Sequence, residues 1–159
     1  MLQDWTGFFA AELGASAALA GLVIVAISIN IARILADPVL PGRAAETLVA
    51  PTGVLILCSF ALVPGQGRAM LAAEILVTGA AMGLVPALII GHALRRGVDN
   101  GYALRRLVLA GMCFLPFVVS GGLLLAGVPG ALYWTVPGVV LSLLATVLNA
   151  WVLLVEILR

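Results

Sequence analysis

Five long apolar runs set the limits on what this chain can fold into. Each holds about 20 or more mostly apolar residues, the length at which an α-helix crosses the hydrocarbon core of a bilayer. The runs lack the alternation of apolar and polar residues that a membrane β-barrel requires, so we predict an all-α fold. The predicted spans, which together form a single transmembrane domain of residues 1–159, are 6–35, 44–63, 69–94, 104–126 and 132–158.

The composition supports the same conclusion. Of the 159 residues, 64% are hydrophobic and 9% are charged. Soluble domains have about 25% charged residues, so water would solvate the surface of such a globule poorly. The sequence therefore predicts an integral membrane helical bundle in which the lipid bilayer takes the place of solvent.

The arginines predict the orientation of this bundle. Cytoplasmic loops of membrane proteins carry an excess of positive charge. With five spans, the loops after the first and third spans lie on the same side as the C-terminus. That side receives every arginine of the sequence except Arg68. We therefore expect an N-out/C-in topology.

The first span has two distinct faces, one polar and one made of small residues. An α-helix has 3.6 residues per turn, so residues 18 apart lie on the same face. Glu12 and Asn30 have this spacing and predict a thin polar stripe. On the opposite face, the small residues Gly14, Gly21 and Ser28 are spaced by seven. Because small residues let membrane helices approach closely, we expect this second face to contact another helix.

The third and fifth spans carry related patterns. In the third span, Glu74 and His92 are again 18 apart, while Gly79 and Gly83 form a GxxxG pattern on another face. This pattern is typical of close helix packing in membranes. In the fifth span a seam changes from small to polar residues, and its members are Gly138, Ser142, Ala145, Asn149 and Glu156.

The polar residues near the predicted cytoplasmic side have simple structural interpretations. Glu46 and Glu156 can pair with nearby arginines or reach water, and Asn149 can make a hydrogen bond between helices. His92 precedes two arginines close to the membrane surface, where it can be solvated or can relay protons.

Glu12 and Glu74 leave two interpretations open. Both lie about five residues inside the predicted outer ends of their helices, roughly 8 Å deep at 1.5 Å per residue. A carboxylate that faces lipid is costly, so each is expected to face the bundle interior, an oligomer interface or water. They either make structural hydrogen bonds or form the outer acidic ring of an ion path. The full candidate path consists of Glu12, Glu74, Asn30, His92, Asn149 and Glu156.

The sequence carries no recognisable catalytic, cofactor or metal motif. The single histidine has no partner at a catalytic spacing, and Cys58 and Cys113 form neither a CxxC pattern nor a metal-ligand set. We therefore predict a protein that is not an enzyme and has no cofactor. The net charge of +1, without a basic stripe, argues against nucleic acid as a partner.

Four segments carry a family resemblance: "GASAALAGLVIVAISIN", "RAAETLV", "LVPGQ" and "LYWTVPGVVLSLLATVLNAWVLLVEILR". They resemble a group of small, uncharacterised bacterial polytopic membrane proteins, some of which are named modulator of FtsH protease. The resemblance implies a multi-pass protein of the bacterial inner (cytoplasmic) membrane that binds a membrane-anchored AAA protease. It implies no catalytic or ligand-binding residues.

Together these observations predict an accessory or regulatory membrane protein that acts through helix–helix contacts with another membrane protein, a membrane protease being one candidate. Self-association into a homo-oligomer is also expected, because five helices offer few surfaces to cover three small-residue faces. The alternative function is a small oligomeric proton or cation pore with Glu12 and Glu74 in its outer acidic ring.

Overall fold

The computed structural model describes residues 3–37, 40–95 and 99–158, and within these residues it is helical, with short connections and no strand. Five helices are long and apolar enough to cross a membrane, as the sequence predicted. They are α1 (Thr6–Ile29), α3 (Leu40–Ala61), α4 (Arg68–Arg95), α5 (Asn100–Leu125) and α6 (Thr135–Leu158). The shorter elements are the 3-10 helices η1 (Gln3–Trp5) and η2 (Ala131–Trp134) and the short helix α2 (Ile31–Ala36).

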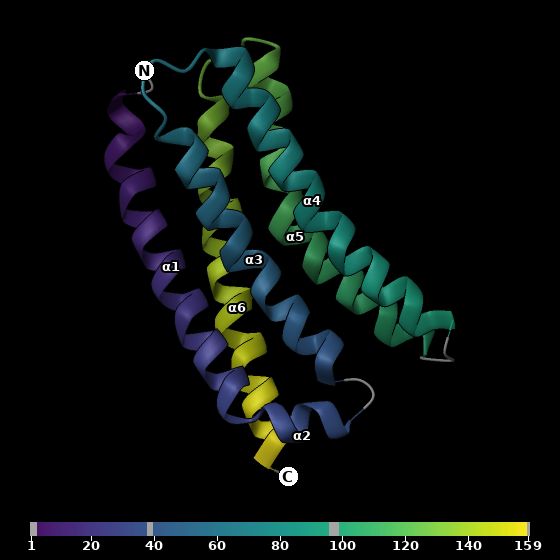
Figure 1. Cartoon of the computed structure of the whole chain (residues 1–159). Helices are drawn as coiled ribbons and strands as arrows, with labels where there is room; N and C mark the ends of the chain where they lie inside the picture. The colour runs from purple at the N-terminus through teal and green to yellow at the C-terminus, as the bar shows by residue number, and fades with distance from the viewer. Residues whose placement is uncertain (1–2, 38–39, 96–98, 159) are drawn as a thin grey trace.

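The first predicted span, 6–35, contains two helices, because α1 ends at Asn30 and α2 begins directly after it. The Asn30 side-chain amide donates a hydrogen bond to the Ala26 carbonyl at 2.9 Å, and its backbone N–H donates to Ile27 at 3.1 Å. Such local side-chain bonds compete with the helical ladder and favour a break. After Asn30 the short helix α2 turns away from the axis of α1, as Figure 1 shows.

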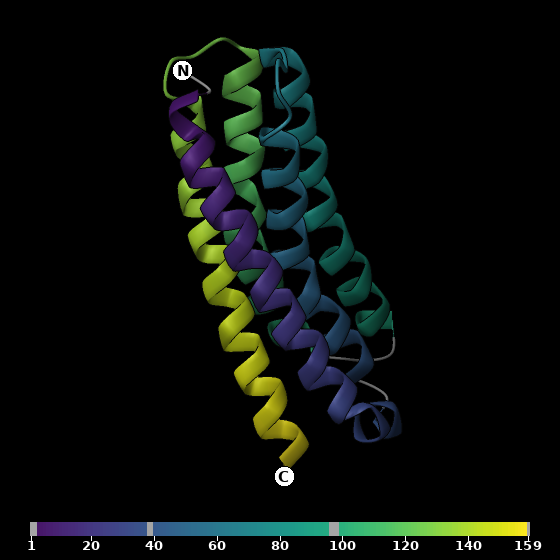
Figure 2. The same ribbon diagram turned by 60° about the vertical axis from the view of Figure 1, so that its left-hand side comes forward.

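The two ends of the bundle differ in composition. The first described residues lie at one end and the last at the other (Figures 1 and 2). We call the first the aromatic end, after Trp5, Phe8, Phe9 and Tyr133. The other is the arginine end, defined by Arg33, Arg43, Arg95, Arg105 and Arg106.

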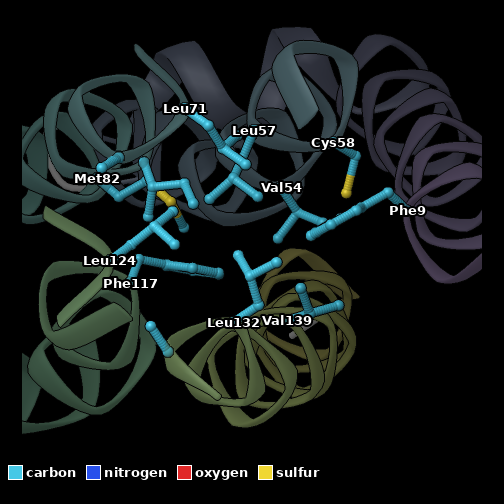
Figure 3. Close-up of a cluster of buried hydrophobic side chains, with 13 residues drawn as sticks. Phe9, Val54, Leu57, Cys58, Leu71, Met82, Phe117, Leu124, Leu132 and Val139 are labelled. Carbon is cyan, nitrogen blue, oxygen red and sulfur yellow. The ribbon is translucent and has the colours of Figure 1, made fainter. Parts of the chain in front are cut away.

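The main hydrophobic core lies toward the aromatic end. Its buried side chains come from all five long helices and from η2, and they converge on one another in Figure 3. Phe9, Leu57 and Phe117 are each at most 1% exposed. In a membrane, where lipid tails are as apolar as these side chains, close packing rather than escape from water would stabilise this cluster.

Glycines allow the close helix contacts around this core. A Cβ placed at Gly79 would lie 3.0 Å from Cβ of Phe117, and one at Gly83 would lie 2.9 Å from the Phe114 ring. A Cβ at Gly138 of α6 would lie 2.8 Å from the Phe117 ring. The GxxxG pattern and the start of the fifth-span seam therefore bring α4, α5 and α6 together within one chain.

Aromatic rings join the start of α1 to η2 at the aromatic end. Trp5 meets Tyr133 edge-on, with ring centroids 4.9 Å apart, and meets Phe8 at 5.7 Å in a similar geometry. Aromatic pairs prefer this arrangement. At the opposite end the α4–α5 pair diverges from α3 and α6, which Figure 1 shows clearly.

Candidate functional site

A cavity of about 560 Å³ lies among α3, α4, α5 and α6 in the half of the bundle toward the arginine end. This volume falls within the range of about 300–1,000 Å³ that is usual for small-molecule sites. Met82 of α4, Cys113 of α5 and Leu141 of α6 are among its apolar lining residues. Met82 also belongs to the main core, so it separates the packed core from the open cavity.

The cavity opens sideways between α5 and α6. Its apolar lining includes side chains on both helices that are 40–57% exposed, which marks the place where the wall reaches the outer surface. These rim residues are Leu109 and Met112 on α5 and Leu144, Leu148 and Val152 on α6. In a membrane, a lateral opening with an apolar rim would face lipid tails.

Charged and polar groups line the cavity toward the arginine end. Arg106 of α5 donates to the Glu46 carboxylate of α3, and this ion pair bridges the two helices. Arg43, Arg105 and Asn149 complete the polar lining. The three arginines and the one glutamate give the described lining a formal charge of +2.

The cavity is elongated along the helix axes. On α5 the lining runs from Arg105 to Cys113, a rise of roughly 12 Å at 1.5 Å per residue. One leaflet of a bilayer has a hydrocarbon thickness of about 15 Å, half of the full core. The cavity, with its charged end included, therefore has a length comparable to the thickness of one leaflet.

The fifth-span seam leads from the core into this cavity. Gly138 and Ser142 are buried, whereas Ala145 and Asn149 line the cavity. Ser142 Oγ is buried without a hydrogen-bond partner. Glu156 lies further along α6, and its side chain is outside the described part of the chain. The seam thus places Asn149 in the same cavity lining as the arginines of α3 and α5.

The two faces of α1 have opposite environments. Ser16 and Val23 of the polar stripe are buried and Glu12 is half-buried, so this stripe turns toward the bundle. A Cβ at Gly14 or Gly21 would meet nothing within 4 Å, and Ser28 is exposed. No part of the described chain covers the small-residue face, in contrast to the faces of α4 and α6.

Glu12 and Glu74 belong to different helix contacts. The Glu74 carboxylate accepts a hydrogen bond from the side-chain amide of Gln66 in the α3–α4 connection. Its helix, α4, packs mainly on α5 and α3, while α1, which carries Glu12, packs on α3 and α6. One chain therefore does not form an acidic ring from these residues.

The other residues of the candidate ion path are also dispersed. Asn30 ends α1, and His92 is exposed near the end of α4. Asn149 is the described member of the path that lines the cavity. Among the described residues, no group of three or more histidines, cysteines or acidic residues could hold a metal ion.

Sequence reasoning used Arg43, Arg105 and Arg106 for topology and as ion-pair partners of nearby glutamates, and the Glu46–Arg106 pair confirms the second use for Glu46. It did not predict that the three arginines share a cavity. Their position at the starts of the second and fourth spans, on one side of the bundle, was the available signal. Chemically, a cationic end beside an apolar wall suits a ligand with an anionic head and a hydrocarbon tail. Comparisons with protein-family models, with curated proteins and with solved structures found no match to this chain.

Proposed function

We propose that this chain is a multi-pass protein of the bacterial cytoplasmic membrane that is not an enzyme and that binds one lipid-like amphiphile in the cavity at the arginine end. The observation that carries the proposal is the combination of an apolar lateral opening between α5 and α6 with three arginines at one end of the same cavity. An accessory protein of this kind would hold a membrane lipid and would carry out no chemistry on it.

The N-out/C-in orientation supports this proposal. Arg33, Arg43, Arg95, Arg105 and Arg106 lie at one end of the bundle, and Arg68 begins α4 at the other. By the positive-inside rule the arginine end is cytoplasmic. The lateral opening then lies in the cytoplasmic leaflet, with the arginines at the depth of the lipid headgroups.

The experiment is a binding titration of the purified protein in a neutral detergent. A single-chain lipid is added, and native mass spectrometry counts the lipids retained per chain. We expect saturable retention of one lipid. Ala145→Phe places a ring in the cavity, and we expect it to reduce affinity at least tenfold, because a filled cavity has no room for the tail.

The matched control is Ala87→Phe. Ala87 is exposed on α4 and is not part of the cavity lining. The same change in side chain at this position should leave lipid retention unaltered. Equal retention by the wild type and both variants would contradict binding in the cavity.

A second candidate function, an accessory or regulatory contact with another membrane protein, is favoured by the uncovered face of α1. α1 is the least buried of the five long helices. Gly14→Leu should weaken co-purification of such a partner, or of a second copy, from native membranes while the bundle stays folded. Recovery of the chain alone at near-physiological expression would argue against this role.

Proton or cation flux stays a prediction of the sequence. Within one chain Glu12 and Glu74 are not brought together, so a pore would need several chains. Liposomes that contain the protein and a pH-sensitive dye test this directly. The pore hypothesis would be supported if the wild type shows flux and Glu12→Gln and Glu74→Gln abolish it. The absence of flux from the wild type would rule the pore hypothesis out.

A further inference from the structure

The polar end of the cavity has a charge pattern that distinguishes among anionic lipids. This inference rests on the proposed lipid binding and adds the chemistry of the headgroup. We infer that the cavity selects lipids with a phosphomonoester headgroup over lipids with a phosphodiester or an uncharged headgroup.

Charge balance is the first argument. The described lining carries a formal charge of +2, from three arginines and Glu46. A phosphomonoester has a second pKa near 6 and carries a charge of about −1.5 to −2 at pH 7. A phosphodiester carries one negative charge and leaves the lining positive. The phosphomonoester is therefore the headgroup that comes closest to neutralising this site.

The positions of the donors are the second argument. Arg43 lies in the first turn of α3, Arg105 and Arg106 lie in the second turn of α5, and Asn149 lies on α6. Three helices thus direct side chains with N–H donors to the lining of one cavity. A phosphomonoester presents three terminal oxygens, and the planar guanidinium group binds such oxygens in a bidentate manner.

Glu46 sets the strength of this selection. Its carboxylate forms an ion pair with Arg106. The Glu46 side chain is 11% exposed and the Arg106 side chain is 20% exposed. A phosphate that approaches Arg106 must therefore compete with Glu46. Removal of the Glu46 charge would raise the charge of the lining to +3 and would strengthen the binding of an anionic headgroup.

The apolar wall identifies the source of the phosphate as a lipid. Leu109 and Met112 of α5 face Leu144 and Leu148 of α6 across the opening, and these side chains offer nothing to an inorganic ion. The hydrocarbon tail of a bound lipid would cover these apolar side chains, and the headgroup of the lipid would then lie at the arginines. A free phosphate would gain only the polar part of the site.

The test compares three lipids that have identical acyl chains and differ in their headgroups. One carries a phosphomonoester, one an anionic phosphodiester with a single negative charge, and one a free hydroxyl group. Dissociation constants are measured at pH 7.5 by native mass spectrometry. We expect the phosphomonoester to bind at least tenfold more tightly than the other two, because charge-assisted hydrogen bonds are the strong ones. Addition of inorganic phosphate at millimolar concentration should not displace it.

Three variants test which residues produce the preference for the phosphomonoester headgroup. Arg105→Gln should reduce the preference for the phosphomonoester at least fivefold, whereas Glu46→Gln should increase its affinity severalfold. Arg95→Gln is the matched control, since Arg95 lies at the same end of the bundle and is not part of the lining. It should leave the preference unchanged.

The outcomes separate this inference from the proposed function. If the three lipids bind equally and Ala145→Phe still blocks them, the cavity binds lipid tails and the headgroup selection is wrong. If none of them binds, both proposals fail. Equal losses in Arg105→Gln and Arg95→Gln would assign the preference to general surface charge and would overturn the inference. Displacement by inorganic phosphate would also overturn it, because the site would then be a simple anion site.

Discussion

The aromatic half and the arginine half of this bundle are built from the same helices, yet they use them differently. Toward the aromatic end, side chains from all five long helices meet in one core, and glycines bring α4, α5 and α6 close together. Toward the arginine end, α4 and α5 diverge from α3 and α6. A cavity with a charged end lies among these four helices.

The difference teaches that the packed core and the proposed binding site are separated along the helix axes. A closely packed half can hold helices in place while the other half stays open to a ligand. In the open half, a partly buried ion pair links α3 to α5. The stability of the bundle should therefore depend on the aromatic half, and ligand binding on the arginine half.

The largest expected effect is loss of the central aromatic side chain. Phe117 is fully buried and contacts the glycines of both α4 and α6. Phe117→Ala should lower the free energy of unfolding by about 3–5 kcal/mol, because it removes packing and leaves a cavity. Unfolding in mixed detergent micelles, followed by circular dichroism, measures this change.

Leu148→Ala is the counterpart in the other half. Leu148 lies at the cavity rim and is exposed, so its loss should cost well under about 1 kcal/mol, in line with other exposed positions. Equal destabilisation by the two substitutions would show that the two halves are packed alike.

Two adjacent glycines of α5 provide the next test. A Cβ at Gly121 would lie 3.0 Å from the Ala72 carbonyl oxygen and would also meet Leu76, whereas a Cβ at Gly122 would meet nothing within 4 Å. Gly121→Leu should destabilise the bundle by about 1–3 kcal/mol through overpacking. Gly122→Leu should leave its unfolding midpoint nearly unchanged. A reversed order would contradict the close contact between α4 and α5.

Much of the helical fold could be predicted because span length and hydropathy are local properties of the sequence. The long helices end within a few residues of the predicted limits, apart from the break at Asn30. That break depends on which carbonyl the Asn30 side chain reaches, and periodicity alone carries no such information. The sequence predicted Asn30 as part of a stripe and missed its effect on the backbone.

The candidate site was harder to predict because it depends on where separate helices diverge. Asn149 was identified as a polar residue of a seam, but its place beside Arg43 and Arg105 follows only from the arrangement of α3, α5 and α6. The expectation of self-association rested on three small-residue faces. Two of them, around Gly79 and Gly138, are covered within the chain, so the face of α1 with Gly14 and Gly21 is the one left for a partner.

The smallest expected effect concerns the ion pair between Arg106 and Glu46. Because both side chains keep partial access to the surroundings, the coupling between them should be about 1 kcal/mol, at the upper end of exposed pairs. A double-mutant cycle with Glu46→Gln and Arg106→Gln, measured by unfolding in mixed micelles, isolates this term. The same cycle measured with a bound phosphomonoester lipid should give a smaller coupling, since the headgroup then competes with Glu46 for Arg106. A coupling that does not change with the lipid would mean that the ion pair only holds α3 and α5 together, and that the divergence of the helices at the arginine end is independent of what the cavity binds.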